Sequence, residues 1–274
     1  MIDLFLMILA LIWIAIASFD DIRKREVPNW LNFSLIIFAV AYRVIYSVVN
    51  SDYYFLMYGL IGLGLFVGVA YLFYYARVFA GGDAKLLMGL GAVLPFTTGF
   101  YSNLKILGMF ILLLMLAGGV YGLFYSIALS IGNFRSFSRE MKNQFKKRRS
   151  FFIISGILAI LSLALVFYIP NFYLFPIFIL LIPLMFIYAK SVEETCLIKE
   201  ISVKELTVGD WLYKPINIHG KLIKPNWEGV SEKEIKLLKN IKKLKIKQGI
   251  PFVPAFLIAF ILLILGYRYL NYLI

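Results

Sequence analysis

The sequence predicts an all-α polytopic membrane protein, a bundle of about six to eight transmembrane helices with a small mixed α/β cytoplasmic domain inserted before the last helix. Hydrophobic residues make up 62% of the 274 residues and charged residues only 16%, a balance typical of membrane proteins. The apolar residues also gather in runs of about 17–25, the length with which a helix crosses a bilayer. The eight candidate spans are residues 2–19, 31–49, 54–75, 84–100, 106–131, 151–168, 172–189 and 251–270.

The first candidate span, residues 2–19, has the position of a signal peptide but lacks its other features. No basic residue precedes its apolar run, no small-x-small cleavage site follows it, and further spans come after it. We therefore expect a retained helix. The fourth span, residues 84–100, is the weakest of the eight, because Pro95 and several glycines interrupt it.

The stretch 190–248 is long and polar enough for an extramembrane domain. Runs at 197–203 and 207–212 have partial strand character, and residues 217–221 are typical of a hairpin tip. The predicted domains are therefore a transmembrane catalytic core at 1–189, with an aspartate-bearing part at 1–100 and a basic cytoplasmic loop at 132–150, a cytoplasmic domain at 190–248, and a C-terminal transmembrane helix at 249–274.

A helix is expected late in the polar stretch. Ser231 followed by Glu234 fits a capping box, with Ser231 as the N-cap. The apolar spacing from Ile235 to Leu244 then predicts a basic amphipathic helix that leads to the last span. Its lysines would face either anionic lipid or solvent.

Lysine and arginine are distributed unevenly, and this sets the expected orientation. When the junctions after the first, third, fifth and seventh spans lie on one side, that side receives 25 of the 28 basic residues. Basic loops stay in the cytoplasm, so we expect a multi-pass plasma membrane protein with its N-terminus outside. The net charge of +13 is first a topology signal and second a sign of contact with anionic lipid headgroups. Nucleic acid is not an expected partner, because topology already explains the lysines.

Two acidic residues lie beside the apolar segments, where a charge is costly and usually functional. Asp21 follows the first span and Asp83 precedes the fourth, so the predicted topology brings both to the cytoplasmic boundary. Two neighbouring carboxyls do not both ionise cheaply and share one proton. The ionised one can activate a water and the protonated one can donate to a peptide carbonyl, which is the chemistry of an aspartic protease.

The residues around Asp83 suggest how it is held. Gly81-Gly82 allows a sharp turn and a close approach to another helix, and Asp83 would then N-cap a helix that begins at the next residue. A helix N-terminus favours an anion and a C-terminus disfavours one, which would make Asp83 the base and Asp21 the proton carrier. The basic residues directly after Asp21 favour the opposite assignment, so the roles stay open.

The residue inventory excludes the other protease chemistries. The chain has one histidine, His219, so it lacks both the ligands of an intramembrane zinc protease and the base of a serine–histidine enzyme. Its one cysteine, Cys196, excludes an internal disulfide and any paired-cysteine metal or redox site. Two aspartates need neither, so we expect no metal and no cofactor.

At these residues the chain resembles the type IV prepilin peptidase family of GxGD aspartic membrane proteases, and more closely its archaeal branch, which includes preflagellin peptidases. In the first motif an aspartate precedes basic residues and, seven positions on, a proline, which selects Asp21 over Asp20. The second motif resembles Gly-x-Gly-Asp-x-Lys, with Ala80 in the place of the first glycine. The two motifs read Asp21-Ile22-Arg23-Lys24-Arg25-Glu26-Val27-Pro28-Asn29 and Gly81-Gly82-Asp83-Ala84-Lys85.

The resemblance implies catalytic roles for Asp21 and Asp83, with Pro28 and Lys85 as supporting residues. It also implies a substrate, a prepilin or pre-archaellin precursor whose short basic leader is cut from a hydrophobic helix at the cytoplasmic boundary. Ala80 departs from the family pattern, and a positive φ there would be strained. Methyl transfer is not implied, since the zinc-binding cysteines of bacterial relatives are missing.

Two alternatives remain from the sequence. An ion- or proton-coupled transporter could use Asp21 and Asp83 as acidic sites, although transporters place such groups near the midplane and show repeats. A presenilin-like protease shares the Gly-Asp motif, but its companion Pro-Ala-Leu motif is missing here, because Leu94-Pro95-Phe96 does not match.

Overall fold

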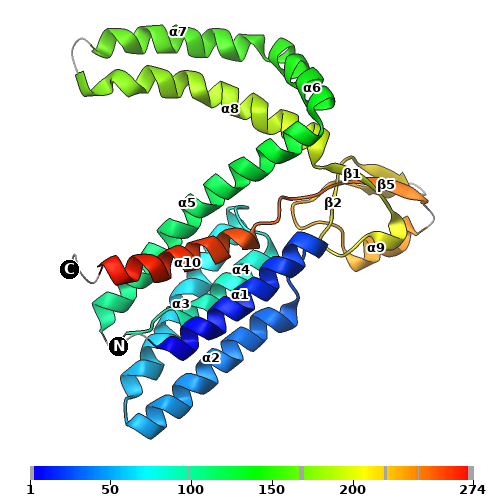
Figure 1. The fold of residues 1–274 in the computed structure, drawn as a ribbon. Helices are drawn as coiled ribbons and strands as arrows, with labels where there is room; N and C mark the ends of the chain where they lie inside the picture. Colours follow the sequence, from blue (N-terminus) through cyan, green and yellow to red (C-terminus); the bar gives the residue numbers. More distant parts are fainter. Residues whose placement is uncertain (1–2, 98, 167–169, 219–220, 240, 271–274) are drawn as a thin grey trace. The chain divides into compact units, whose positions relative to one another are not determined.

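The computed structural model describes residues 3–97, 99–166, 170–218, 221–239 and 241–270 (Figure 1). The chain divides into two compact units. The first comprises Met1–Phe124 and Ile250–Ile274, and the second comprises Tyr125–Gly249. Each unit is described by itself.

The first unit is a helical bundle that carries both aspartates. Helix α1 packs against α10, which comes from the other end of the sequence, and α2 packs against α1 and α3 (Figure 1). Helix α5 begins in this unit and ends in the second. The helices of the bundle are α1 (Leu4–Lys24), α2 (Asn29–Asn50), α3 (Tyr53–Tyr75), α4 (Gly81–Val93), the first part of α5 (Phe100–Gly132) and α10 (Val253–Leu270).

Local signals set the helix ends near the first motif. The Asp3 carboxylate accepts the Leu6 N–H (3.0 Å) and so caps the start of α1. Helix α1 ends where Arg25 adopts a left-handed conformation (φ 60°) and donates its N–H to the Asp21 carbonyl. Pro28 then stands as the residue before α2, where its fixed φ suits a helix start. The chain thus reverses direction within a few residues of Asp21.

Helix α4 differs from the predicted span 84–100. It starts earlier, at Gly81, and ends at Val93, so its 13 residues extend about 20 Å, less than the roughly 30 Å of hydrocarbon in a bilayer. It contacts α1, α2 and α3, and nearly all of its side chains are buried. The helix alone is therefore too short to span, and it is surrounded by protein instead of lipid.

Glycines let α3 and α4 approach closely. A Cβ at Gly91 would lie 2.5 Å from the Phe66 Cβ and 2.6 Å from the Gly62 carbonyl oxygen. Small residues at helix contacts are typical of membrane bundles, where tight packing replaces the hydrophobic effect as the source of helix association. This contact fixes α4 against α3.

The second unit contains a helical hairpin and a small domain with two sheets. Phe175–Cys196 forms α8, which packs antiparallel against α7 and also contacts α6 (Figure 1). The expected basic loop at 132–150 is largely this helix α6, with single residues separating it from α5 and α7. The helical elements are the end of α5, α6 (Phe134–Lys147), α7 (Arg149–Val166), the short 3-10 helix η1 (Pro170–Leu174), α8, the 3-10 turn η2 (Val203–Glu205) and α9 (Glu232–Leu238).

The mixed α/β character expected of the polar stretch is present, with one correction. Strand β5 lies between β1 and β2 in an antiparallel sheet, and β3 pairs with β4. The predicted helix from Ile235 to Leu244 is wrong beyond Leu238, because α9 ends there and β5 follows. Leu244 and Ile246 are buried and the lysines beside them face outward, as a strand requires. The strands are β1 (Ile198–Ser202), β2 (Trp211–Leu212), β3 (Ile216–Ile218), β4 (Lys221–Ile223) and β5 (Lys243–Lys247).

Two other local predictions fall in this domain. The capping box is confirmed, since the Ser231 hydroxyl accepts the Glu234 N–H and the Glu234 carboxylate accepts the Ser231 N–H (2.8 Å). The predicted hairpin tip lies between β3 and β4, but His219 itself lies outside the described residues.

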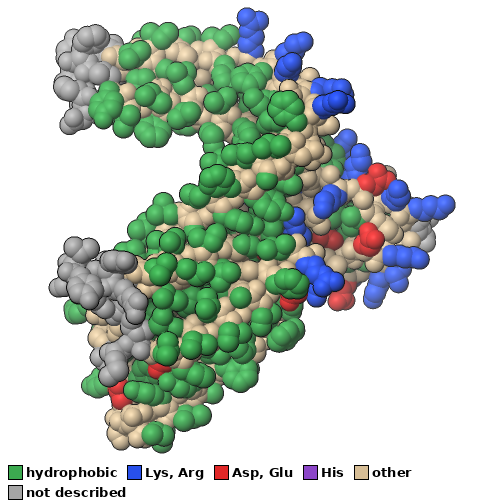
Figure 2. Space-filling view, viewed as in Figure 1, with side chains coloured by type: hydrophobic (Ala, Val, Ile, Leu, Met, Phe, Trp, Pro, Cys, Tyr) green, Lys and Arg blue, Asp and Glu red, His purple; other side chains and the backbone are tan. Residues whose placement is uncertain are grey.

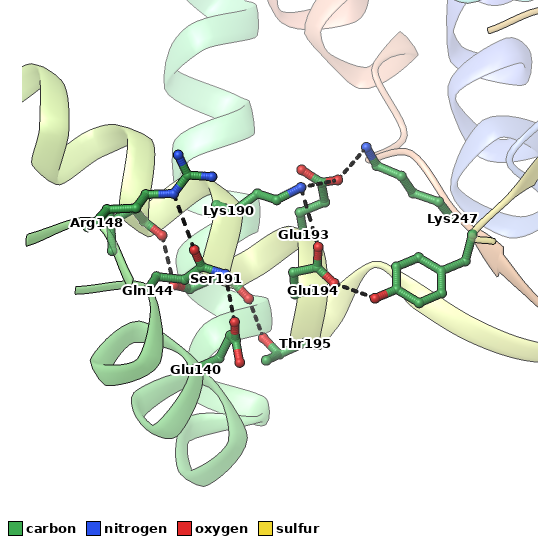
Figure 3. A network of polar contacts seen from close by, with 11 residues as sticks. Glu140, Gln144, Arg148, Lys190, Ser191, Glu193, Glu194, Thr195 and Lys247 are labelled. Atoms are coloured by element: carbon green, nitrogen blue, oxygen red, sulfur yellow. Dashed lines mark hydrogen bonds and ion pairs between the residues drawn. The ribbon is translucent and has the colours of Figure 1, made fainter. Parts of the chain in front are cut away.

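Charged side chains join the sheet domain to the end of α8 (Figure 3). The Lys247 ammonium contacts the Glu193 carboxylate at 2.7 Å, and the Tyr213 hydroxyl donates to Glu194 (2.7 Å). Lys190 bridges both glutamates at 3.1 and 3.3 Å. The network fixes the end of β5 and the residue that follows β2 beside the end of α8.

The helices identify a multi-pass membrane protein. Among the described residues, five helices are long and apolar enough to cross a bilayer, and two shorter apolar helices lie at Arg149–Leu163 and Val253–Gly266. The all-α polytopic class predicted from the sequence is confirmed. The last residues of the predicted span 151–168 lie outside the described part of the chain.

Candidate active site

Asp21 lies in the last turn of α1, and its side chain is buried, with 6% of its surface exposed. Its carboxylate accepts the N–H of Val253 at 2.9 Å. Val253 is the first residue of α10, 232 positions away, so the carboxylate sits at the positive end of that helix. The next residue, Pro254, has no N–H and cannot donate at this helix start, whereas the N–H of Phe252, just before Val253, is also directed at the Asp21 carboxylate.

Asp83 is the third residue of α4 and is 9% exposed. The sequence predicted it as the N-cap of a helix starting at Ala84, and this is corrected, because α4 begins two residues before Asp83. The side chain reaches back to accept the N–H of Ala80 at 3.2 Å, as the third residue of a capping box does. Ala80 has φ −71°, so the alanine in place of glycine introduces no strain.

The fold brings the two aspartates together. Helices α1 and α4 pack against each other, and the carboxyls of Asp21 and Asp83 lie close enough to interact electrostatically. Asp20 is directed elsewhere, since its carboxylate pairs with Lys24 on the same helix at 3.5 Å. Of the two adjacent aspartates, Asp21 is therefore the one that shares a buried site with Asp83.

The glycine pair lies within the first turn of α4. Gly81 and Gly82 have helical backbone, so no sharp turn is needed there, and close packing is found at Gly82. A Cβ at Gly82 would lie 3.3 Å from the Cβ of Val27 in the first motif. The Gly82 carbonyl also accepts a hydrogen bond from the Asn32 side chain at 3.4 Å.

The predicted supporting residues also lie where the motifs meet. Pro28 precedes the first turn of α2, and the next residue, Asn29, accepts a hydrogen bond from the Lys85 ammonium at 2.7 Å. Lys85 thus links the second motif to the end of the first. Asn29 belonged to the quoted motif, whereas Asn32 carried no motif signal, although one helical turn places it on the same side of α2.

The structure removes the basis for assigning the catalytic roles from the helix dipoles. It placed Asp83 at a helix N-terminus and Asp21 at a C-terminus. Asp21 also reaches a helix N-terminus, that of α10, so both carboxylates receive the same kind of stabilisation. The assignment of base and proton donor stays open.

Sequence reasoning missed Arg43 on α2. Its side chain is fully buried, although the sequence analysis assigned it no role. The guanidinium donates to the carbonyls of Ala92, Val93 and Pro95 at 2.8, 3.1 and 2.6 Å, and to Phe55 at 2.6 Å. Arg43 therefore satisfies the carbonyl end of the helix whose other end carries Asp83. A lone arginine inside an apolar span was the available signal.

Among the residues that the structure describes, no group of three or more histidine, cysteine, aspartate or glutamate side chains is arranged to hold a metal ion. The site consists of two buried carboxyls, two helix N-termini and the packed glycines. Such a site can hold a water between an acid and a base.

Comparison with known proteins bears on this arrangement. Residues 8–127, which include both aspartates, match the model of the type IV leader peptidase family. This stretch is similar to type IV leader peptidases. The resemblance drawn from the two motifs is thereby confirmed over these residues.

Curated archaeal relatives of the leader peptidase segment agree. The chain is 31% identical over 98 residues to the preflagellin peptidase of Methanococcus maripaludis, covering 35% of this chain and 42% of that protein. It is 31% identical over 88 residues to the preflagellin peptidase of Methanocaldococcus jannaschii, covering 32% and 37%. The match thus spans about two fifths of the length of these relatives. The alternative of an ion- or proton-coupled transporter finds no support in these similarities.

Proposed function

We propose that this protein is a membrane aspartic endopeptidase that removes the short basic leader from type IV pilin-like or archaellin precursors. The proposal depends on one observation, the pairing of Asp21 and Asp83 in a buried site within the leader peptidase segment. The preflagellin peptidases to which the segment is similar act, by their name, on such a precursor. The precursor would be the protein's membrane-embedded partner.

The geometry supports a general acid–base mechanism. One carboxylate takes a proton from a water, whose oxygen attacks the peptide carbonyl carbon, while the protonated partner donates its proton to the carbonyl oxygen. The proton taken from water then passes to the leaving amine, the C–N bond breaks, and one hydroxyl of the tetrahedral intermediate returns its proton to the carboxylate that had donated one, which restores the pair. The N–H groups of Ala80 and Val253 hold the two carboxylates in place during these transfers.

The proposed orientation follows from the distribution of basic residues. With the N-terminus outside, 25 of 28 lysines and arginines face the cytoplasm, and both aspartates lie at that boundary. Water would reach the pair from the cytoplasm, and a precursor would present the junction between its leader and its helix at the same depth.

The deciding experiment is cleavage of a leader-bearing precursor in membranes that contain wild type, Asp20→Asn, Asp21→Asn or Asp83→Asn. The amide keeps the side-chain size but cannot exchange the proton, and a positioned acid or base contributes about 10²–10⁴-fold. We expect processing by wild type and Asp20→Asn, and at least a 100-fold slower rate for each of the other two. Asp20→Asn is the matched control, since it alters the neighbouring carboxylate, which pairs with Lys24.

The interpretation requires that the inactive variants fold. Thermal unfolding in detergent should show the same transition for all four proteins, within a few degrees. Full processing by either Asp21→Asn or Asp83→Asn would exclude the proposed mechanism, and equal loss in Asp20→Asn would show that the assay does not distinguish the pair from its surroundings.

A further inference from the structure

Helix α6 connects two apolar helices without a long loop. Asn133 alone separates it from α5, and Arg148 alone separates it from α7. Helices α5 and α7 are apolar along their lengths, whereas α6 is rich in charged residues. The chain therefore leaves an apolar layer, forms α6, and enters an apolar layer again, so α6 belongs at the membrane surface.

One side of α6 is fixed against α8. Phe137 and Gln144 are buried, and the Phe137 ring meets the Tyr188 ring at a centroid distance of 5.7 Å. At the end of α6 the Arg148 guanidinium lies 4.7 Å from the centre of the Phe186 ring. These contacts, all within the second unit, set the rotation of α6 about its axis.

The opposite side is a basic stripe made of Arg135, Arg139, Lys142 and Lys146. At 3.6 residues per turn these four side chains fall within about 60° of arc, and Phe137 and Gln144 point the opposite way. All four are exposed. Within the described chain none of the four takes part in an ion pair, unlike the neighbouring lysines at 190 and 247. Their charge is therefore available to an external anion.

The surroundings of the stripe mark the boundary between water and hydrocarbon. Figure 2 shows lysine and arginine side chains gathered where α6 lies, next to a hairpin covered by apolar side chains. Figure 3 shows the ionised network at the end of α8 together with Glu140 and Gln144 of α6 and with Arg148, the residue that follows α6. Such charged groups are costly inside hydrocarbon. Phe134 and Phe151 are exposed at the two ends of α6, where aromatic side chains anchor interfacial helices.

We propose that α6 lies in the headgroup layer and that its basic stripe binds the phosphate groups of anionic lipids. A helix tethered at both ends by apolar helices cannot leave the surface, and the closest concentrated anions there are lipid phosphates. Four cationic side chains along one side of the helix can contact the phosphates of several neighbouring headgroups. The proposal goes beyond the proteolytic function and does not depend on it.

The test measures lipid retained by the full-length protein. Purified protein in a neutral detergent is titrated with phosphatidylglycerol or with zwitterionic phosphatidylcholine, and bound lipids are counted by native mass spectrometry. We expect wild type to prefer phosphatidylglycerol. The variant with all four stripe residues changed to Gln should bind it more than about tenfold more weakly, because each charge near an anionic surface contributes roughly a factor of five.

Matched variants separate the stripe from net charge. Changing four exposed lysines of the sheet domain to Gln (Lys204, Lys224, Lys233 and Lys236) removes the same charge and should leave binding unchanged. Arg135→Lys with Arg139→Lys keeps the positive charge and should also leave it unchanged. Two half-variants, Arg135→Gln/Arg139→Gln and Lys142→Gln/Lys146→Gln, should each give a partial loss, and thermal unfolding verifies that each is folded.

Several results would overturn the proposal. Equal loss in the sheet-domain variant would show a net-charge effect, and unchanged binding in the stripe variant or in both half-variants would show that the lipid binds elsewhere. Displacement of phosphatidylglycerol by millimolar inorganic phosphate would identify a small-anion site instead of a lipid site. Stronger stripe-dependent binding of a polyuridylate probe than of phosphatidylglycerol would identify a nucleic-acid surface.

Discussion

Replacing Arg43 by Met removes the guanidinium hydrogen bonds to the carbonyl end of α4 while keeping an unbranched apolar side chain. The guanidinium serves the carbonyls of Ala92, Val93 and Pro95, together with that of Phe55 on α3. The variant therefore tests whether a short helix inside a membrane bundle depends on one arginine to satisfy its end.

The size of the effect follows from how few other donors are present. If α4 continued, its last carbonyls would accept the N–H groups of Phe96 and Thr97. Instead, the Phe96 N–H donates to the Leu94 carbonyl and the Thr97 N–H donates to the Asn103 side chain. Three carbonyls would thus lose their donor, at about 1–3 kcal/mol each in a soluble core. Polar contacts inside membranes average about 0.6 kcal/mol, which sets a floor near 2 kcal/mol. We expect a loss of about 2–5 kcal/mol.

Reversible unfolding in mixed micelles measures this loss. Arg43→Lys should be intermediate, because an ammonium keeps the charge but lacks the planar fork that reaches several carbonyls at once. A Cβ at Gly59 would overlap the Arg43 side chain, so Gly59→Ala should destabilise wild type more than it destabilises Arg43→Met. A change below about 0.5 kcal/mol in Arg43→Met, or strict additivity with Gly59→Ala, would refute the reasoning.

Two further predictions concern packing and capping. Gly91→Ala should lower the free energy of unfolding by about 1–3 kcal/mol in the same assay, because the new Cβ would overlap Phe66. A Cβ at Gly64 would meet open space, so Gly64→Ala should change the stability little. Equal effects of the two substitutions would contradict the close packing of α3 and α4. In the sheet domain, the Ser231 N–H and hydroxyl lower the pKa of Glu234 from its usual 4.5. The stabilisation is therefore present above that pH and is lost as pH falls through the lowered pKa. Hydrogen exchange of α9 should show wild type better protected than Glu234→Gln at pH 7, with a difference that shrinks as the pH falls below 4.5, and a pH-independent difference would exclude this cause.

The candidate site was readable from the sequence where its signals are local. An aspartate at the end of an apolar run, with a proline seven positions later, and a Gly-Gly-Asp before another run are patterns within single segments. Membrane class follows in the same way, since length and composition of each run decide it. The pairing of Asp21 with Asp83 then required only that the end of the first run and the start of the fourth lie on the same side of the membrane.

What the sequence did not reveal depends on contacts between distant segments. Asp21 accepts a hydrogen bond from a backbone N–H 232 residues away. Nearly every residue has a backbone N–H, so the sequence does not indicate which one will be the donor. The carbonyls at the end of α4 accept hydrogen bonds from Arg43, which comes from another helix. Residues 243–247 alternate as a strand should, but the helical spacing from Ile235 suggested one continuous helix, and only pairing with β1 and β2 distinguishes the two.

The enclosure of α4 by its neighbours has a consequence for how the protein responds to its host membrane. Spans that touch acyl chains tilt or stretch when bilayer thickness changes. Helix α4 contacts α1, α2 and α3, and the carbonyls at its end accept hydrogen bonds from Arg43. A mismatch between helix length and bilayer thickness therefore does not act on α4 directly. Asp83 is therefore held in place by neighbouring helices and not by direct contact with acyl chains.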